Sequence, residues 1–249
     1  MNEKKNKILI IAHRGASKIA PENTLLAFRK AIELKANYIE FDVFTSKDGE
    51  LVVTHDPELS RLTGYSGFTE DLTLEELKTL DFGEGEKIPT LLDVIDLTKG
   101  KIGLCVEILS RNIGKKLVQL LGESDLVENT IISSFNFKEL KKIQKIEPDF
   151  KFASLIPYEG GVVNNPKWTT WRVKKKAIDI AAKNNFSFIH AHYLIVDEQL
   201  IDYSHQQNLK LNVYTVDVKP AIKRLIKNGV DGIITNDIIA VKDVINKIT

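Results

Sequence analysis

The 249-residue sequence contains a single cysteine, Cys105, which excludes a disulfide framework and a cluster of thiolates around a metal. Because Cys105 lies in an apolar run, we expect a buried, unreactive thiol. No segment approaches the roughly 18 apolar residues of a membrane-spanning helix. The formal net charge is only +1, so bulk electrostatics favours neither a nucleic acid nor an anionic membrane as a partner.

The N-terminus also lacks the features of a secretory signal peptide. Its basic start, MNEKKNK, is followed by the short apolar run ILIIA before His13 and Arg14. Such a run is too short for a signal peptide, and no cleavage site with small residues follows it. We therefore expect a cytoplasmic protein without stable membrane insertion.

The sequence does contain a regular alternation of short apolar runs and longer segments with helical spacing. Near-continuous apolar strands joined by crossover helices are typical of a parallel sheet. Eight such units in about 250 residues predict a (β/α)8 TIM barrel. The main alternative is an open doubly wound sheet, and the lack of a glycine-rich phosphate loop after the first run disfavours it. The eight predicted strands are residues 7–13, 38–43, 102–108, 130–135, 150–156, 186–192, 210–216 and 231–235.

One segment departs from this alternation. Asp48-Gly49 lies between two β-rich runs, which predicts a hairpin with a type I′ turn. In that register His55 lies opposite Asp42. The stretch over residues 57–100 is then an insertion, too small to be an independent domain, that caps one end of the barrel.

Polar groups gather at the predicted carboxyl ends of the strands, where a barrel carries its active site. His13 and Arg14 end the first apolar run. The Pro-Glu-Asn-Thr stretch at 21–24 follows, and a loop in which Asn23 or Thr24 caps the next helix is the favoured interpretation.

Three carboxylates accompany these groups. Glu40 and Asp42 share one face of the second predicted strand, and Glu107 lies among apolar neighbours in the third. Converging buried carboxylates are costly unless a cation holds them. Hard oxygen ligands suit Mg²⁺, Ca²⁺ or Mn²⁺. The alternative is that each carboxylate pairs separately with a lysine or an arginine.

Together, a divalent cation, two histidines and an arginine are suited to phosphodiester cleavage. The cation and Arg14 can hold phosphoryl oxygens. One of His13 and His55 can take a proton from the nucleophile while the other gives one to the leaving oxygen. An unperturbed imidazole titrates near pH ~6.5, so both roles are accessible at neutral pH. These residues predict a metal-assisted phosphodiesterase.

An ordered set of motifs resembles the glycerophosphodiester phosphodiesterase family over almost the whole chain: HRG, PENT, EFD, KDGELVVTHD, VEI, IISSFN and GVDGIITND. The resemblance implies a single TIM-barrel domain over residues 1–249 with a small insertion after the His-Asp motif. It also implies hydrolysis of small-molecule glycerophosphodiesters to sn-glycerol 3-phosphate and an alcohol, with bound Mg²⁺ or Ca²⁺. In related enzymes the neighbouring glycerol hydroxyl is thought to attack first, which gives a cyclic phosphate.

The resemblance also implies roles for the residues named above, and leaves the oligomeric state and the order of the two histidines open. A lysophospholipase D-type enzyme is one alternative, and it would need an apolar groove near Trp168 and Trp171 or in the insertion. A barrel that binds a phosphate ester without turnover is another. The implied roles are acid–base catalysis for His13 and His55, metal binding for Glu40, Asp42 and Glu107, and phosphate contact for Arg14.

Three positions depart from the usual pattern of this family. Leu109 stands where a lysine is usual, which removes a positive charge near the phosphate. The segment Tyr-Thr-Val-Asp at 214–217 replaces Trp-Thr-Val-Asn, and Thr-Asn-Asp at 235–237 replaces the more usual Thr-Asp. Tyr214 can still provide an aromatic wall, whereas Asp217 would add negative charge near an anionic substrate if it faces the site.

The remaining polar candidates are weaker. His190 and His192 share a strand face, and a hydrogen-bonded structural histidine is the favoured interpretation. His205 is expected at the surface. Ser134 has no histidine at a fixed spacing, which disfavours a serine nucleophile.

Overall fold

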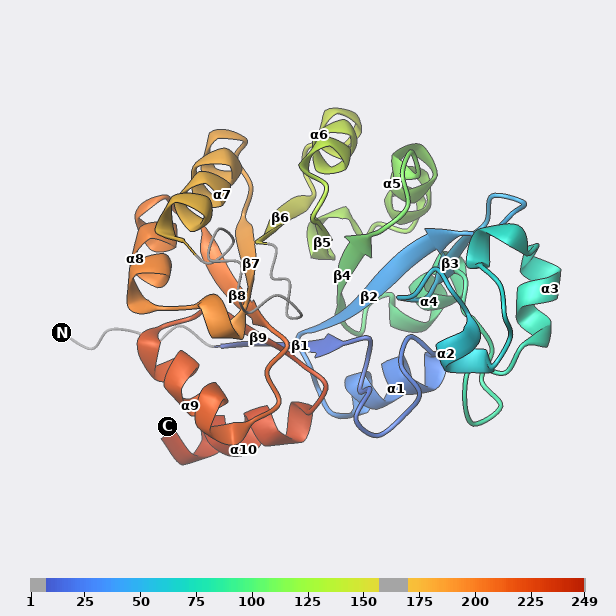
Figure 1. Ribbon diagram of the computed structural model, residues 1–249, viewed down its shortest axis with the longest axis horizontal. Coiled ribbons are helices and arrows are strands. Elements are labelled where there is room, and N and C mark those ends of the chain that lie inside the picture. Colours follow the sequence, from blue (N-terminus) through green and yellow to red (C-terminus); the bar gives the residue numbers. More distant parts are fainter. Residues whose placement is uncertain (1–7, 157–169, 249) are drawn as a thin grey trace.

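The computed structural model describes residues 8–156 and 170–248. Its parallel strands close into a barrel inside a ring of helices (Figure 1). Closure occurs at β1, which pairs with β2 on one side and with β9 on the other. The predicted (β/α)8 barrel is therefore confirmed. The barrel strands are β1 (Leu9–His13), β2 (Tyr38–Thr45), β4 (Gly103–Ile108), β5 (Thr130–Ser134), β6 (Lys151–Ile156), β7 (Phe188–His192), β8 (Lys210–Tyr214) and β9 (Gly232–Thr235).

A helix follows each barrel strand and turns its apolar stripe toward the sheet. In α9, for example, Ile222 and Leu225 are buried while the lysines face outward. Among the described residues, no helix is long and apolar enough to cross a membrane. The outer helices are α1 (Leu25–Glu33), α4 (Leu91–Thr98), α5 (Gly114–Glu123), α6 (Phe137–Ile146), α7 (Trp171–Lys183), α8 (Glu198–Gln206), α9 (Lys219–Asn228) and α10 (Ile238–Ile248).

Two apolar layers stabilise the barrel, one outside its strands and one inside them. The larger lies between the strands and the helices. The smaller fills the interior and includes Ile11, Cys105, Ile131 and Phe188, so the thiol is buried as expected. Because apolar side chains occupy this part of the interior, the polar side chains of the site gather at the carboxyl ends of the strands.

The segment between β2 and α4 extends to one side of the barrel (Figure 1). It contains β3 (Leu51–Val53), α2 (Ser60–Thr63), a 3₁₀ turn (Thr69–Asp71) and α3 (Leu74–Thr79). These elements surround a small apolar cluster of their own, whereas α4 packs into the main core. The organisation as one domain with an insertion over 57–100 stays a prediction.

The hairpin between β2 and β3 differs from the predicted type I′ turn. Val43 pairs with Val53, so the register is shifted by one residue and the Thr54 N–H donates to the Asp42 carbonyl at 3.1 Å. Gly49 has a φ of 80°, whereas Asp48 keeps a negative φ. The longer loop, ending in a left-handed glycine, places His55 beyond the end of β3.

Candidate active site

The first strand ends in charged groups because the chain turns sharply there, at the carboxyl end of the barrel. Arg14 and Gly15 both have positive φ, 55° and 82°. A Cβ on Gly15 would lie 2.7 Å from the Ala27 Cβ, so glycine is required for close packing against α1. The unfavourable backbone at Arg14 is compensated by its N–H, which donates to Glu40 Oε2 at 3.0 Å.

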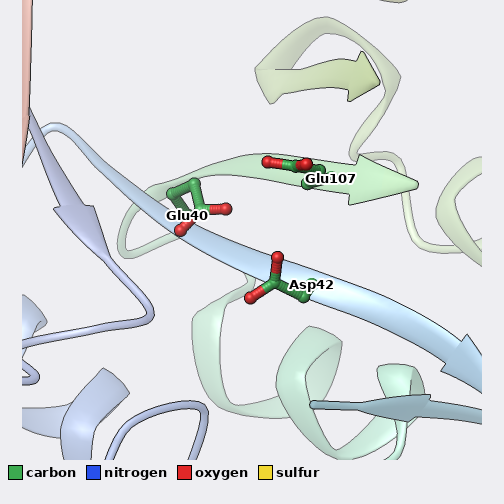
Figure 2. Close-up of side chains that lie close together, drawn as sticks. All are labelled: Glu40, Asp42 and Glu107. Carbon is green, nitrogen blue, oxygen red and sulfur yellow. The ribbon is translucent and has the colours of Figure 1, made fainter. Parts of the chain in front are cut away.

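The three predicted metal ligands converge on one point. Glu40 and Asp42 project from β2, and Glu107 projects from the neighbouring strand β4, in register with Asp42 (Figure 2). One ligand oxygen from each lies within 4.8 Å of the others. Glu40 and Asp42 are buried, and Glu107 is partly exposed.

Their electrostatics fits a bound cation. Burial and the neighbouring carboxylates raise the pKa of Glu40 well above its ordinary value, and burial and Asp42 raise that of Glu107 to about 8. Within residues 8–156 and 170–248, neither glutamate forms an ion pair with a lysine or arginine. This argues against the alternative in which each carboxylate pairs separately with a lysine or an arginine. A divalent cation would satisfy this set of oxygens.

Arg14 is held beside the carboxylates from two directions. Its Nη1 lies 2.8 Å from Glu22 Oε1, and its Nε lies 3.6 Å from Asp42 Oδ2. The Nε is buried and has no hydrogen-bond partner. Arg61 of α2 holds the same Glu22 carboxylate at 2.6 Å. Burial alone would raise the pKa of Glu22, but hydrogen bonds from Arg61 and Arg14 hold it below its ordinary value.

The stretch at 21–24 does more than the predicted loop and cap. Thr24 is the N-cap of α1, accepting a hydrogen bond from the Ala27 N–H, as expected. Asn23 instead has a φ of 56° and is buried, and its Nδ2 donates to Asp42 Oδ2 at 3.0 Å. Glu22 and Asn23 are therefore site residues that residue-by-residue reasoning missed, and the only sequence signal for them was the PENT motif.

Both histidines use Nδ1 for a structural contact. The His55 Nδ1 lies 2.7 Å from Asp56 Oδ1, and Arg61 contacts the other oxygen of that carboxylate. The His13 Nδ1 lies 2.7 Å from the Asn236 Oδ1. Burial and the Arg14 charge lower the pKa of His13. In each ring, Nε2 is the nitrogen left for proton transfer.

An aromatic group lies across the site. The Tyr214 hydroxyl donates to the Ile156 carbonyl at 3.0 Å, and its ring makes edge contacts with Phe135 and His192 at 6.5 and 5.8 Å. Burial raises the pKa of Tyr214, and the charge of Glu107 adds to this. Phe135 is 48% exposed, and sequence reasoning gave it no role.

Several other candidate residues from the sequence make structural contacts or lie at the surface. His190 is buried and contacts the Asn212 amide at 3.1 Å, and burial lowers its pKa to about 3, as expected for a structural histidine. His205 is an exposed partner of Asp231. The Trp171 ring packs against Tyr203 at 5.4 Å, between α7 and α8. Trp168 lies outside the described residues. Ser134 donates to the Ile108 carbonyl.

A closed parallel barrel with its polar residues at the carboxyl ends of the strands defines a (β/α)8-barrel enzyme. The chain belongs to the glycerophosphoryl diester phosphodiesterase family, whose model matches residues 13–240. A glycerophosphodiester phosphodiesterase of Caldanaerobacter subterraneus subsp. tengcongensis is 41% identical over 244 residues, which cover 93% of this chain and 95% of that protein.

Solved structures show the same fold. A phosphodiesterase from Oleispira antarctica in complex with the product sn-glycerol-3-phosphate matches with a TM-score of 0.82 and 26% identity, over 96% of each chain. A glycerophosphoryl diester phosphodiesterase described as putative, from Silicibacter pomeroyi, matches with a TM-score of 0.87 and 22% identity, over 98% of this chain and 94% of that one.

Proposed function

We propose that this protein hydrolyses glycerophosphodiesters to sn-glycerol 3-phosphate and an alcohol. The observation that carries the proposal is the convergence of three carboxylates beside Arg14 and two histidines with Nδ1 engaged. The relative with 41% identity supports this substrate class. A small molecule is therefore the expected partner, and a cytoplasmic location stays a prediction from the N-terminal sequence.

A divalent cation, Mg²⁺ or Ca²⁺ with Mn²⁺ as a substitute, would bind Glu40, Asp42 and Glu107 and supply positive charge beside the phosphate. Arg14 would bind a phosphoryl oxygen, since Glu22 and Asp42 hold its guanidinium in place.

The two histidines would move the protons of the reaction. One Nε2 would accept the proton of the attacking hydroxyl, and the other would donate a proton to the leaving alcohol oxygen. The attacking hydroxyl is either water or the neighbouring hydroxyl of the glycerol, and the second course gives a cyclic phosphate that water then opens.

A lysophospholipase D-type activity is the second candidate. Loops that follow β1, β5, β7 and β8 each expose an apolar side chain at the active end of the barrel. An acyl chain leaving the site would meet such residues. They are Ile19, Phe135, Leu194 and Val218, which are 51%, 48%, 59% and 57% exposed.

Release of glycerol 3-phosphate from glycerophosphocholine and glycerophosphoethanolamine tests the proposal. The assay is run with EDTA and then with Mg²⁺, Ca²⁺ or Mn²⁺ added back. Metal-dependent release supports hydrolysis and the carboxylate site. Release of the free alcohol from lysophospholipids alone, with lysophosphatidic acid as the other product, would favour the second candidate. No cleavage of either class would favour a barrel that binds phosphate esters without turnover.

A further inference from the structure

Asn236, the residue after β9, joins His13 to Asp217. Its Oδ1 lies 2.7 Å from the His13 Nδ1 and accepts from the Ser17 Oγ at 2.8 Å. Its Nδ2 donates to Asp217 Oδ2 at 2.6 Å, and its backbone N–H donates to Asp217 Oδ1 at 2.8 Å. Asp217 therefore faces the amide of Asn236, and its carboxylate is already engaged by these donors.

The donor and the acceptor of each hydrogen bond between His13, Asn236 and Asp217 follow from which groups carry a proton. An ionised carboxylate only accepts, so the amide nitrogen of Asn236 must face Asp217. The amide oxygen must then face His13. An amide oxygen also only accepts, so the proton on the neutral His13 ring must reside on Nδ1.

Asp217 is itself fixed. Its Oδ1 accepts from the Thr235 Oγ1 at 2.8 Å as well as from the Asn236 N–H, so one carboxylate oxygen is anchored while the other accepts from the Asn236 amide. The pair thus has a defined geometry, which a flexible surface carboxylate would lack.

We propose that Asp217 and Asn236 form a positioning pair that holds His13 in the Nδ1–H tautomer and presents its Nε2 lone pair to the substrate. The proposal rests on the proposed function, because it assigns His13 to proton transfer. Neither residue would touch the reacting atoms.

This pair gives one account of two departures from the family pattern. The family usually has Asn at the position of Asp217 and Asp at the position of Asn236, so the two residue types are exchanged in this protein. Because the two side chains are in contact, the exchange retains one carboxylate and one amide at the junction. The two changes therefore compensate each other.

The reciprocal variants test this directly. Asn236→Asp alone would place two carboxylates against each other. Asp217→Asn alone would leave only one acceptor oxygen for donors on two sides. The double variant Asp217→Asn with Asn236→Asp restores a donor facing an acceptor, and the Asp carboxylate can still accept from His13.

We expect each single variant to lower kcat about 10- to 100-fold, a part of the 10²–10⁴-fold that a positioned acid–base group contributes, with little change in KM. The double variant should recover most of the lost kcat. Lys18→Met is the matched control, because it removes the neighbouring ion pair with Asp237 without contacting His13. Urea unfolding checks that each variant is folded.

A second measurement needs no turnover. In wild-type protein labelled with ¹⁵N-histidine, the His13 ring should carry its proton on Nδ1, and in Asn236→Ala the Nε2–H tautomer should become populated. Because this reading is independent of activity, it separates failure of the positioning pair from failure of the proposed function. An unchanged tautomer in Asn236→Ala, or a double variant no more active than the single variants, would overturn the proposal.

Discussion

Replacing Glu107 with glutamine is expected to stabilise the protein when no metal is bound. The same change should abolish the activity of the protein when metal is supplied. Burial and the Asp42 charge raise the pKa of Glu107 from 4.5 to about 8. A carboxyl with a higher pKa in the folded state holds its proton there after the unfolded chain has lost it. The free energy of unfolding therefore falls as pH rises from 4.5 toward 8, and below 4.5 both states are protonated.

The size of the effect follows from the pKa. Each pH unit within that interval lowers the free energy of unfolding by about 1.4 kcal/mol, so the whole interval amounts to about 5 kcal/mol. Because part of the Glu107 side chain contacts solvent, screening reduces this to about 3 kcal/mol. Glutamine removes the charge with little change of shape, and it also removes one proposed metal ligand.

Urea unfolding in EDTA measures this difference. At about pH 8 the Glu107→Gln variant should exceed the wild type by about 3 kcal/mol, and at about pH 5 by less than about 1 kcal/mol. Glu70→Gln, an exposed carboxylate in the segment beside the barrel, is the control and should leave the pH dependence unchanged.

Adding Mg²⁺ or Ca²⁺ completes the experiment. The wild type should become more stable because the cation binds the folded state, while Glu107→Gln should respond weakly. A variant that is no more stable than the wild type at high pH, or that keeps the same pH dependence, would refute the account of repelling buried carboxylates.

The other predictions concern the histidines and Leu109. His13→Ala and His55→Ala should each abolish glycerol 3-phosphate release and leave urea unfolding cooperative, and normal activity in either would contradict the proton-transfer roles. Leu109→Lys should lower KM for glycerophosphocholine by restoring a positive charge near the phosphate, and an unchanged or raised KM would mean that another group already compensates. Burial holds the pKa of His190 near 3 in the folded protein, so this residue should contribute a loss of stability as pH falls below 6.5, opposite in sign to the contribution of Glu107. Between about pH 6.5 and 4.5 this loss should amount to about 2 to 3 kcal/mol. Urea unfolding of His190→Gln, which keeps an acceptor for Asn212, should lack that contribution. An equal pH dependence of the free energy of unfolding in the wild type and the variant would contradict the lowered pKa of His190.

The barrel could be predicted from the sequence because its elements carry strong local patterns. The strand Thr130–Ser134, for example, is buried at every position, which is why it appears as a near-continuous run. The hairpin was predicted with the wrong turn because the Asp-Gly signal does not distinguish turn types. Ser46 donates to the Asp48 carboxylate at 2.5 Å and accepts from the Glu50 N–H, and these local bonds favour the longer loop.

The supporting residues of the site could not be predicted in the same way. Glu22 and Arg61 lie in polar loops or short helices with no periodic pattern, and their contact depends on how the segment beside the barrel folds back. Asp217 was expected to place its charge near the substrate if it faced the site. The structure instead engages it with Thr235 and Asn236, because β8 and β9 are neighbouring parallel strands whose carboxyl ends lie side by side.

Barrel closure also sets the order in which the site can be assembled during synthesis. His13 lies near the beginning of the chain, and its Nδ1 partner, Asn236, is separated from it by 223 positions in sequence. The carboxylates on β2 and β4 emerge from the ribosome long before β9 can pair with β1. A nascent chain that has not reached β9 therefore contains all three carboxylates but lacks the Asn236 partner of His13, and the complete site forms only once the last strand has been made and docked.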